Sequence, residues 1–363
     1  MPLSFLPMPA QPLQPVPTAP DEHLTVVVCC SLQPELAERI RAVDPPRITV
    51  LHEPELLPTG PYAGGYLGSK PRLDAAGLAR WRETLARADI LFEFDWLEPA
   101  RLRETAPKAR WLQASKSGIG EFVRRTGLDR SGIVLCTAAG IHAMPLAEWV
   151  TFGALWLVKQ LPRMLDQQRR HHWEQFDAGL VAGRRALVVG LGGVGREIAR
   201  QLDALGVEVW GVRRSAEGEA VPHVRRVFAF DGFDAALPDV DFLVIACPYN
   251  AETHHLLTAD RLAAMKPSAG VINVARGAII DEPALVAALR DGTIAGAVLD
   301  VQEQEPTPPD APIWDAPNVL ISPHRASMVD VENSLLVDLF CENLRRYLDG
   351  RPLLNVYDAA RAY

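Results

Sequence analysis

Three residues whose side chains could together assist the transfer of a hydride to a carbonyl group occur in the later part of the chain. They are Arg276 in "INVARGAII", Glu305 in "VLDVQEQEP" and His324 in "LISPHRAS". An arginine can hold a carboxylate by two parallel hydrogen bonds and polarise the neighbouring ketone. A histidine can donate a proton to the carbonyl oxygen, and a glutamate bonded to its other ring nitrogen would orient it and favour its protonated form. These residue types therefore suit the reduction of a 2-keto acid.

Taken singly, each residue has a simpler explanation: a surface arginine, a loop glutamate before Pro306 and a buried histidine. Each one, however, follows an apolar, strand-like run, and the three runs are "AGVINVA", "AGAVLD" and "NVLISP". The carboxyl ends of parallel strands meet at one edge of a sheet, where open α/β sheets bind ligands. This shared position favours a common chemical role.

A glycine-rich turn, "LVVGLGGVGREIARQL", lies upstream of these residues and predicts a dinucleotide site. Gly190 would permit the tight turn, Gly192 would let the backbone approach a pyrophosphate, and Gly195 would let helix and strand pack closely. The intervening Gly193 and Val194 would offer backbone N–H groups at a helix N-terminus, where anions bind. The alternative is a glycine-rich turn that holds no ligand.

The next predicted strand, in "GVEVWGVRRSAEGE", ends in Arg213, Arg214 and Ser215 instead of the acid that binds an adenosine ribose. Two guanidinium groups and a hydroxyl could bind a 2′-phosphate. Glu208 lies too early in the strand to replace the acid. The pattern therefore favours NADP(H), with NAD(H) possible. A solvated, exposed turn is the alternative.

The elements that would position these groups alternate between strand and helix from His23 onward, and again from Arg184 onward. This predicts an α/β fold with two Rossmann-like domains, a flavodoxin-like substrate domain and a dinucleotide-binding domain, each a parallel sheet with helices on both faces. A long helix is expected from about Pro145 to residues 167–170, with an interruption possible at Pro162. Its residues Trp149, Phe152 and Trp156 are expected to face the core, or alternatively a subunit interface.

Composition excludes several classes of function. The net charge of -8 over 363 residues argues against a nucleic-acid-binding protein, and no apolar run is long enough to span a bilayer. Five scattered cysteines indicate buried thiols in a reducing compartment, so we expect a cytoplasmic protein. No metal site is predicted, because the His171-His172 and His254-His255 pairs lack partners at ligand spacing. Residues 1–22 are rich in proline and are expected to be a disordered tail.

From His142 to about Val356 the sequence resembles the D-isomer-specific 2-hydroxyacid dehydrogenase family. The resemblance is carried by "GIHAMPLAEWV", "VVGLGGVGREIA", "CPYNAETHHLL", "MKPSAGVINVARGAIIDEPALVAAL", "AGAVLDVQEQEP", "PIWDAPNVLISPH" and "NLRRYLDGRPLLNV". It implies catalytic roles for Arg276, Glu305 and His324, and a homodimer joined through the helix after Pro145. It also implies that the nicotinamide half of the cofactor site is lined by Cys247, Pro248, Ala275 and Asp300.

The resemblance divides the chain into a substrate domain, residues 23–137 plus 326–363, and a dinucleotide-binding domain, residues 138–325. It is weaker near the N-terminus, where family members bind the substrate carboxylate by a loop that is often followed by an aspartate. Here that loop is "ASKSGIGEF", so Ser117, Gly118 and Ile119 would bind substrate and Gly120 replaces the usual acid. Lys116 would either favour a substrate with a second anionic or polar group, or lie in solvent.

The arginines after the second strand are similar to those of glyoxylate/hydroxypyruvate reductases, which favour NADPH. Glu305 stands where formate dehydrogenases of the superfamily carry glutamine, which counts against formate. We therefore expect a D-stereospecific, NADP-preferring oxidoreductase for a small 2-keto or 2-hydroxy acid. The alternatives are a dinucleotide-sensing corepressor and a family member with another substrate, such as phosphoglycerate.

Overall fold

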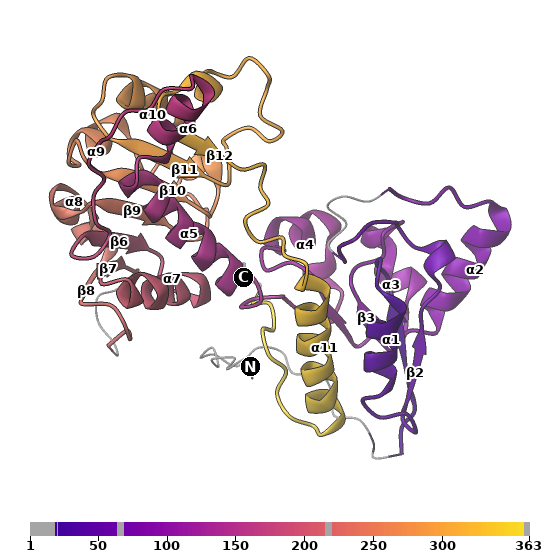
Figure 1. Cartoon of the computed structure of the whole chain (residues 1–363). Helices are drawn as coiled ribbons and strands as arrows, with labels where there is room; N and C mark the ends of the chain where they lie inside the picture. The colour runs from indigo at the N-terminus through magenta and orange to yellow at the C-terminus, as the bar shows by residue number, and fades with distance from the viewer. Residues whose placement is uncertain (1–18, 20, 64–68, 215–219, 359–363) are drawn as a thin grey trace. The chain divides into compact units, whose positions relative to one another are not determined.

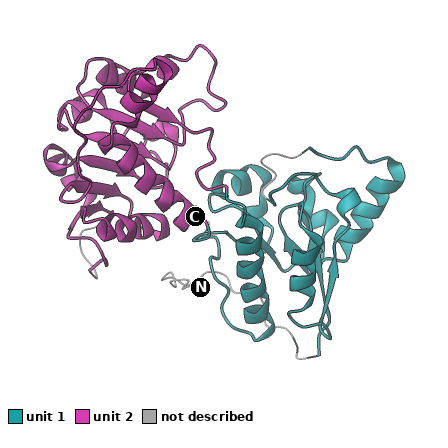
Figure 2. Ribbon diagram, viewed as in Figure 1, with its two compact units in different colours: residues 1–141, 329–363 teal, residues 142–328 magenta. Residues whose placement is uncertain are grey.

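The computed structural model describes residues 19, 21–63, 69–214 and 220–358, which form two compact units (Figure 2). Unit 1 comprises residues 1–141 and 329–363, and unit 2 comprises residues 142–328. Each unit contains one parallel sheet. The predicted proline-rich tail lies almost entirely outside the described residues.

Unit 1 is built on a five-stranded sheet with the order β2-β1-β3-β4-β5. Figure 1 shows helix α1 of this unit beside helix α11. Successive side chains of a strand point to opposite faces, so Val26 and Phe92 pack on one side while Val27 and Leu91 pack on the other. Helices α1 and α11 cover the first face, and α2, α3 and α4 cover the second. The strands are β1 (Leu24–Val28), β2 (Ile48–Leu51), β3 (Ile90–Phe92), β4 (Trp111–Gln113) and β5 (Val134–Cys136); the helices are α1 (Pro34–Arg41), α2 (Ala75–Ala86), α3 (Leu102–Thr105), α4 (Gly120–Thr126) and α11 (Glu332–Leu348).

Unit 2 is built on a seven-stranded sheet with the order β12-β11-β10-β9-β6-β7-β8. The strand order reverses between β6 and β9, which is where dinucleotide-binding sheets bind their ligand. The strands are β6 (Arg185–Val189), β7 (Glu208–Val212), β8 (Arg226–Phe228), β9 (Phe242–Ile245), β10 (Gly270–Asn273), β11 (Gly296–Leu299) and β12 (Val319–Ile321); the helices are α5 (Ala143–Val158), α6 (Leu161–Arg169), α7 (Gly193–Ala204), α8 (Phe233–Ala236), α9 (Ala259–Ala263) and α10 (Glu282–Arg290).

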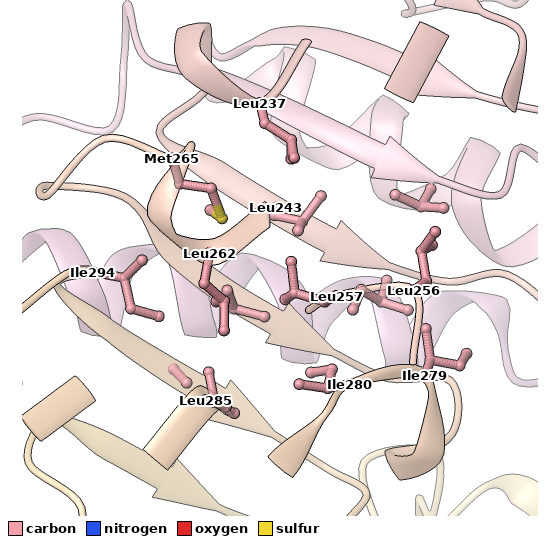
Figure 3. Packing of buried hydrophobic residues seen from close by; sticks show 14 of the residues in the cluster. Leu237, Leu243, Leu256, Leu257, Leu262, Met265, Ile279, Ile280, Leu285 and Ile294 are labelled. Carbon is pink, nitrogen blue, oxygen red and sulfur yellow. The ribbon is translucent and has the colours of Figure 1, made fainter. Parts of the chain in front are cut away.

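Both faces of this second sheet are also buried. One face packs against α8, α9 and α10, and Figure 3 shows part of that cluster, with Leu262 of α9 and Leu285 of α10 lying over the strands. The other face packs against α5 and α7 through residues such as Val150 and Ile198. The predicted fold class, α/β with two Rossmann-like parallel sheets covered on both faces, is therefore confirmed.

The long helix expected after Pro145 is interrupted, but before Pro162, which lies in the first turn of α6. It forms α5 and α6, separated at Lys159 and Gln160, and Gln160 has a positive φ of 52°. The expected core-facing stripe is wrong for Phe152, which is exposed, whereas Trp156 is buried. Helix α5 is apolar at most positions, so spacing alone does not identify its buried face.

Within the described residues, no helix is both long and apolar enough to cross a bilayer. The five cysteines are buried and unbonded. Burial raises the pKa of each thiol, and it raises the pKa of Cys247 and of Cys341 to about 11. These thiols are therefore protonated packing groups at neutral pH, as the sequence predicted.

Candidate active site

The glycine loop follows β6 at the point where the strand order reverses, and two of its glycines are required by packing. Gly190 has a φ of 98°, and a Cβ there would lie 2.7 Å from the Cα of Cys247. A Cβ at Gly195 would overlap the carbonyl oxygen of Gly190. The loop and α7 can therefore approach each other closely only because both positions lack a side chain.

The other two glycines face open space. A Cβ at Gly192 or at Gly193 would meet no described atom within 4 Å. Gly192 is the N-cap of α7 and provides no capping side chain, so the first N–H groups of that helix are not capped by it. This geometry fits a pyrophosphate, which needs close backbone approach and unoccupied N–H donors beside it.

The end of β7 presents the two arginines that the sequence singled out. Arg213 is half-buried and its N–H donates to the carbonyl oxygen of Phe228, while Arg214 is exposed. Ser215 lies outside the described residues. Glu208 begins β7, where its carboxylate accepts from Nε1 of Trp210 at 2.7 Å, so it does not occupy the position of a ribose-binding acid.

Arg276 follows β10 in a segment that two neighbouring residues hold in place. The buried side chain of Asn273 accepts from the N–H of Ala275 and donates to the carbonyl oxygen of Arg276, both at 3.0 Å. A Cβ at Gly277 would overlap the backbone of Gln302. The loop after β10 therefore packs closely on the loop after β11. The Arg276 side chain remains exposed.

Glu305 and His324 form a pair between the loops after β11 and β12. Nδ1 of His324 lies 2.7 Å from Oε2 of Glu305, and Oε1 of Glu305 accepts from the N–H of Gln302 at 3.1 Å. Burial raises the pKa of the Glu305 carboxyl, but the hydrogen bond and charge of His324, the N–H of Gln302 and the charge of Arg276 outweigh it and lower the pKa. Two of the three residues predicted from sequence, Glu305 and His324, are thus in direct contact, and the charge of Arg276 acts on the same carboxyl group.

Asp300 fixes the backbone that carries His324. Its buried Oδ1 accepts from Oγ of Ser322 at 2.8 Å and from the N–H groups of Arg325 and Ala326 at 2.9 Å. Its carbonyl oxygen accepts from the N–H of His324 at 2.9 Å. His324 has a φ of 51°, a conformation that a non-glycine residue keeps only where its surroundings enforce it.

Three other sequence-predicted residues border this edge of the sheet. Cys247 and Pro248 follow β9, with Cys247 beside Gly190, and Ala275 precedes Arg276 and accepts from its Nη1 at 2.6 Å. The supporting residues Asn273 and Gly277 were not predicted. A polar residue ending the apolar run "GVIN" was the available signal for Asn273.

The paired histidines after β9 have a structural partner. His255 Nε2 lies 3.0 Å from Oε1 of Glu303, and its ring stacks on that of His254 at 4.0 Å. The N–H of His255 donates to the carbonyl oxygen of Ala278. His255 therefore links the loop after β9 to the loops that carry Arg276 and Glu305, a connection that the sequence did not indicate.

In unit 1, the predicted substrate loop joins β4 to α4. Lys116 and Gly118 are exposed, Ser117 is half-buried and Ile119 is buried. Within the described residues, no group accepts a hydrogen bond from the backbone N–H of Ser117, Gly118 or Ile119. Successive unpartnered N–H groups in a turn are typical of an anion-binding loop.

This sheet order, with a glycine loop at its switch point and an imidazole–carboxylate pair at the same edge, defines a nicotinamide-dinucleotide-dependent dehydrogenase domain. The family pattern described as D-isomer specific 2-hydroxyacid dehydrogenase, NAD binding domain, matches residues 152–326, and a glyoxylate reductase of Thermofilum pendens is 38% identical over 260 residues, which are 69% of this chain and 75% of that protein. The chain belongs to the D-isomer specific 2-hydroxyacid dehydrogenase family.

Solved structures agree with this assignment. A family protein from Aeromonas salmonicida has a TM-score of 0.75 at 29% identity, covering 93% of this chain and 100% of that one. An NADPH-dependent glyoxylate/hydroxypyruvate reductase from Sinorhizobium meliloti, in complex with NADP and sulfate, has a TM-score of 0.71 at 25% identity, covering 94% of this chain and 100% of that one. The protein is therefore an oxidoreductase that uses a nicotinamide dinucleotide.

Proposed function

We propose that this protein is an NADPH-dependent reductase of small 2-keto acids, of the glyoxylate/hydroxypyruvate type, that forms D-2-hydroxy acids. The observation that carries the proposal is the His324–Glu305 pair at 2.7 Å, with the charge of Arg276 acting on the same carboxylate. The names of the Thermofilum pendens and Sinorhizobium meliloti relatives support this class of substrate.

Each residue has a distinct role in the proposed reaction. The bound nicotinamide supplies the hydride that goes to the ketone carbon. Arg276 holds the substrate carboxylate by two N–H groups and polarises the ketone. Protonated His324 donates its Nε2 proton to the carbonyl oxygen, which completes the hydroxyl group, and Glu305 holds Nδ1–H and stabilises the imidazolium until that step.

The remaining predicted residues bind and position. The Gly190–Gly195 turn would hold the pyrophosphate, and Cys247, Pro248, Ala275 and Asp300 would line the nicotinamide half of the site. Arg213 and Arg214 would bind a 2′-phosphate, because their guanidinium groups follow β7 where an NAD enzyme carries an acid. In unit 1, the Ser117–Ile119 N–H groups would bind the substrate carboxylate, and Lys116 would favour a second anionic group.

We also propose that the protein is a cytoplasmic homodimer. Five buried, unbonded thiols support a reducing compartment. Large apolar side chains that are exposed on α5 and α6 and in the segment after α6 support a subunit interface there; they are Met144, Phe152, Leu155, Met164, Leu165, Trp173 and Leu180.

The decisive experiment assays glyoxylate, hydroxypyruvate, phosphorylated hydroxypyruvate and oxaloacetate with NADPH and with NADH in parallel. We expect glyoxylate or hydroxypyruvate to be reduced with a higher kcat/KM for NADPH than for NADH. Replacing Arg213 and Arg214 by alanine should reduce that preference without abolishing turnover with NADH. Tight NADPH binding with no turnover of any 2-keto acid would favour the corepressor alternative instead.

A further inference from the structure

Glu93, in unit 1, has a backbone conformation that is costly for a glutamate. It follows β3 directly and has a φ of 76°, in the left-handed region that favours glycine. Residues other than glycine keep such a conformation when surrounding contacts enforce it, and they do so most often at functional sites. The contacts of Glu93 identify which function the conformation serves.

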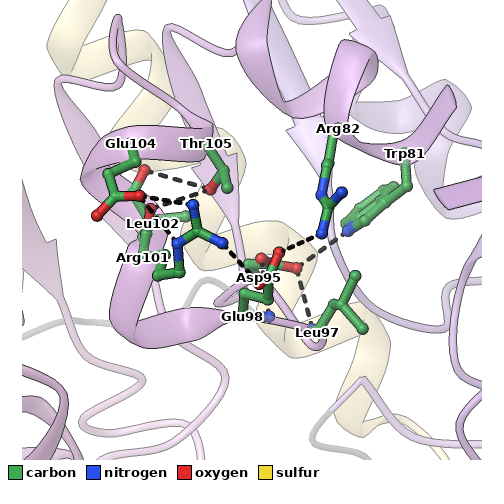
Figure 4. A network of polar contacts seen from close by, with 9 residues as sticks. All are labelled: Trp81, Arg82, Asp95, Leu97, Glu98, Arg101, Leu102, Glu104 and Thr105. Atoms are coloured by element: carbon green, nitrogen blue, oxygen red, sulfur yellow. Dashed lines mark hydrogen bonds and ion pairs between the residues drawn. The ribbon is translucent and has the colours of Figure 1, made fainter. Parts of the chain in front are cut away.

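The backbone on both sides of Glu93 is firmly held. Its own N–H donates to the carbonyl oxygen of Gln113 at 2.8 Å, which extends the pairing of β3 with β4. Two residues later, buried Asp95 accepts from Nε1 of Trp81 and from the N–H of Leu97, both at 3.0 Å (Figure 4). These hydrogen bonds hold the backbone of residues 93–97 in place, and the backbone in turn determines where the Glu93 side chain lies.

The Glu93 carboxylate spans two loops. Oε1 accepts from the N–H of Phe94 at 3.0 Å, and Oε2 accepts from the N–H of Ser115 at 2.7 Å. Ser115 is 1% exposed, so water cannot replace this acceptor easily. The carboxylate therefore links the end of β3 to the first residue of the loop after β4 through two hydrogen bonds.

That loop contains the backbone N–H groups of Ser117, Gly118 and Ile119, which donate to no acceptor among the described residues. Beyond Ser115, the carbonyl oxygen of Lys116 accepts from the N–H of Ala138 at 3.1 Å, and α4 begins at Gly120. Between these anchors lies the segment Ser117–Ile119, whose backbone N–H groups are available to an anion as far as the described residues show. Ser115 is the point at which Glu93 is bonded to this loop, and buried Ile119 holds the other end of the segment in the core.

We propose that Glu93 is a positioning residue that sets the geometry of the Ser117–Ile119 loop and thereby the affinity for the substrate carboxylate. The inference rests on the proposed function, since it takes this loop as the carboxylate-binding element. Glu93 does not touch the reacting atoms in this account. It acts through Ser115. The left-handed backbone conformation of Glu93 directs its carboxylate toward the N–H group of Ser115.

The test compares Glu93→Ala and Glu93→Gln with the wild-type protein, using the best 2-keto acid and NADPH. In Glu93→Ala we expect KM for the keto acid to rise about tenfold or more while kcat changes less than about threefold, because a binding geometry is lost and the chemistry is not. The Kd of oxamate, a non-reducible analogue, should rise by the same factor. Glu93→Gln keeps one acceptor oxygen and should lie between the two. The Kd of NADPH should not change.

Glu121→Gln is the matched control, because Glu121 is an exposed carboxylate in the first turn of α4 and has no hydrogen bond to the loop. It removes the same charge near the same segment and should leave KM within about twofold of wild type.

A KM change of equal size in this control would show an effect of charge alone and would overturn the inference. So would an unchanged KM and oxamate Kd in a folded Glu93→Ala protein. If Glu93→Ala does not fold, an unchanged KM in Glu93→Gln decides against it. Absence of turnover in the wild-type protein would count against the proposed function and is separate from these outcomes.

Discussion

Nδ1 of His324 and Oε2 of Glu305 lie 2.7 Å apart, although the two residues follow different strands and are separated by 19 positions in the chain. The contact exists because β11 and β12 are parallel neighbours and their carboxyl ends meet at one edge of the sheet. A hydrogen bond at Nδ1 determines which ring nitrogen faces the substrate. The adjacency of the two strands therefore orients the imidazole that we propose as the proton donor.

The first prediction concerns Glu305→Gln and the pH dependence of catalysis. Burial raises the pKa of Glu305, but the hydrogen bond and charge of His324 outweigh it and lower the pKa, so an ionised carboxylate lies against Nδ1 at neutral pH. A glutamine retains a hydrogen-bond acceptor but removes the charge. Because Nδ1 would lose its ionised partner, we expect the kcat/KM pH profile to change and kcat at neutral pH to fall about tenfold or more. An unchanged profile measured from pH 5 to 9 would contradict the assigned role.

The same pair should affect stability in acid. A carboxyl whose pKa is lower in the folded protein contributes stability above its unfolded pKa of about 4.3, and that contribution is lost as pH falls through the folded value. Thermal unfolding temperatures should therefore fall more steeply in the wild-type protein than in Glu305→Gln as pH is lowered below about 4. Parallel curves would show that the pair does not form in solution.

The second prediction concerns Arg276→Lys. A lysine keeps the positive charge but cannot form the two parallel hydrogen bonds that a guanidinium offers a carboxylate. We expect kcat/KM for the keto acid to fall about a hundredfold, with the Kd of NADPH within about twofold of wild type. Arg290→Lys on α10 is the control, because Arg290 is exposed and its guanidinium donates to the carbonyl oxygen of Pro312, away from Glu305 and His324 in the chain. Equal losses in both variants would exclude a specific role for Arg276.

The third prediction separates the two kinds of glycine in the cofactor loop. Gly195→Ala places a methyl group on the carbonyl oxygen of Gly190, so it should lower the unfolding temperature and impair NADPH binding together. Gly192→Ala meets open space in the protein, so it should fold normally and lose NADPH affinity alone. Calorimetry and fluorescence titration measure the two effects. A stable Gly192→Ala protein that binds NADPH normally would exclude pyrophosphate contact at this position.

The fourth prediction concerns Asp300→Asn. Oδ1 of Asp300 accepts three hydrogen bonds that fix the Ser322–Ala326 segment, and an amide supports such a network less well than a carboxylate. We expect a loss of about 1–3 kcal/mol in the free energy of unfolding and a larger fall in kcat than in keto-acid affinity. Asp310→Asn, at an exposed carboxylate in the same region, should change neither. If kcat is retained despite the lost stability, Asp300 does not position His324.

Sequence alone predicted the fold class and the proximity of Glu305 and His324, because strand–helix alternation implies a parallel sheet and such sheets bring strand ends together. It did not predict β8, whose Arg226 is exposed and lies against the ring of Phe228 at 4.4 Å, since a short, half-exposed edge strand has no clear apolar pattern. The contacts of Asn273 with its neighbours and of Glu93 with Ser115 were also missed. They depend on backbone conformation and on tertiary approach, which residue spacing does not encode.

The last prediction concerns the exposed apolar side chains of α5, α6 and the segment after α6. Trp173 is 91% exposed and Leu165 is 40% exposed, which is unfavourable for large apolar side chains unless another surface covers them. We expect the wild-type protein to sediment as a dimer, and Leu165→Glu to shift it toward monomer at micromolar concentration, because a carboxylate would be buried without a partner. Leu205→Glu is the control, since Leu205 is 37% exposed at the end of α7, outside this apolar surface. A monomeric wild-type protein, or a dimer that resists Leu165→Glu and Trp173→Glu alike, would place the subunit interface elsewhere or exclude it.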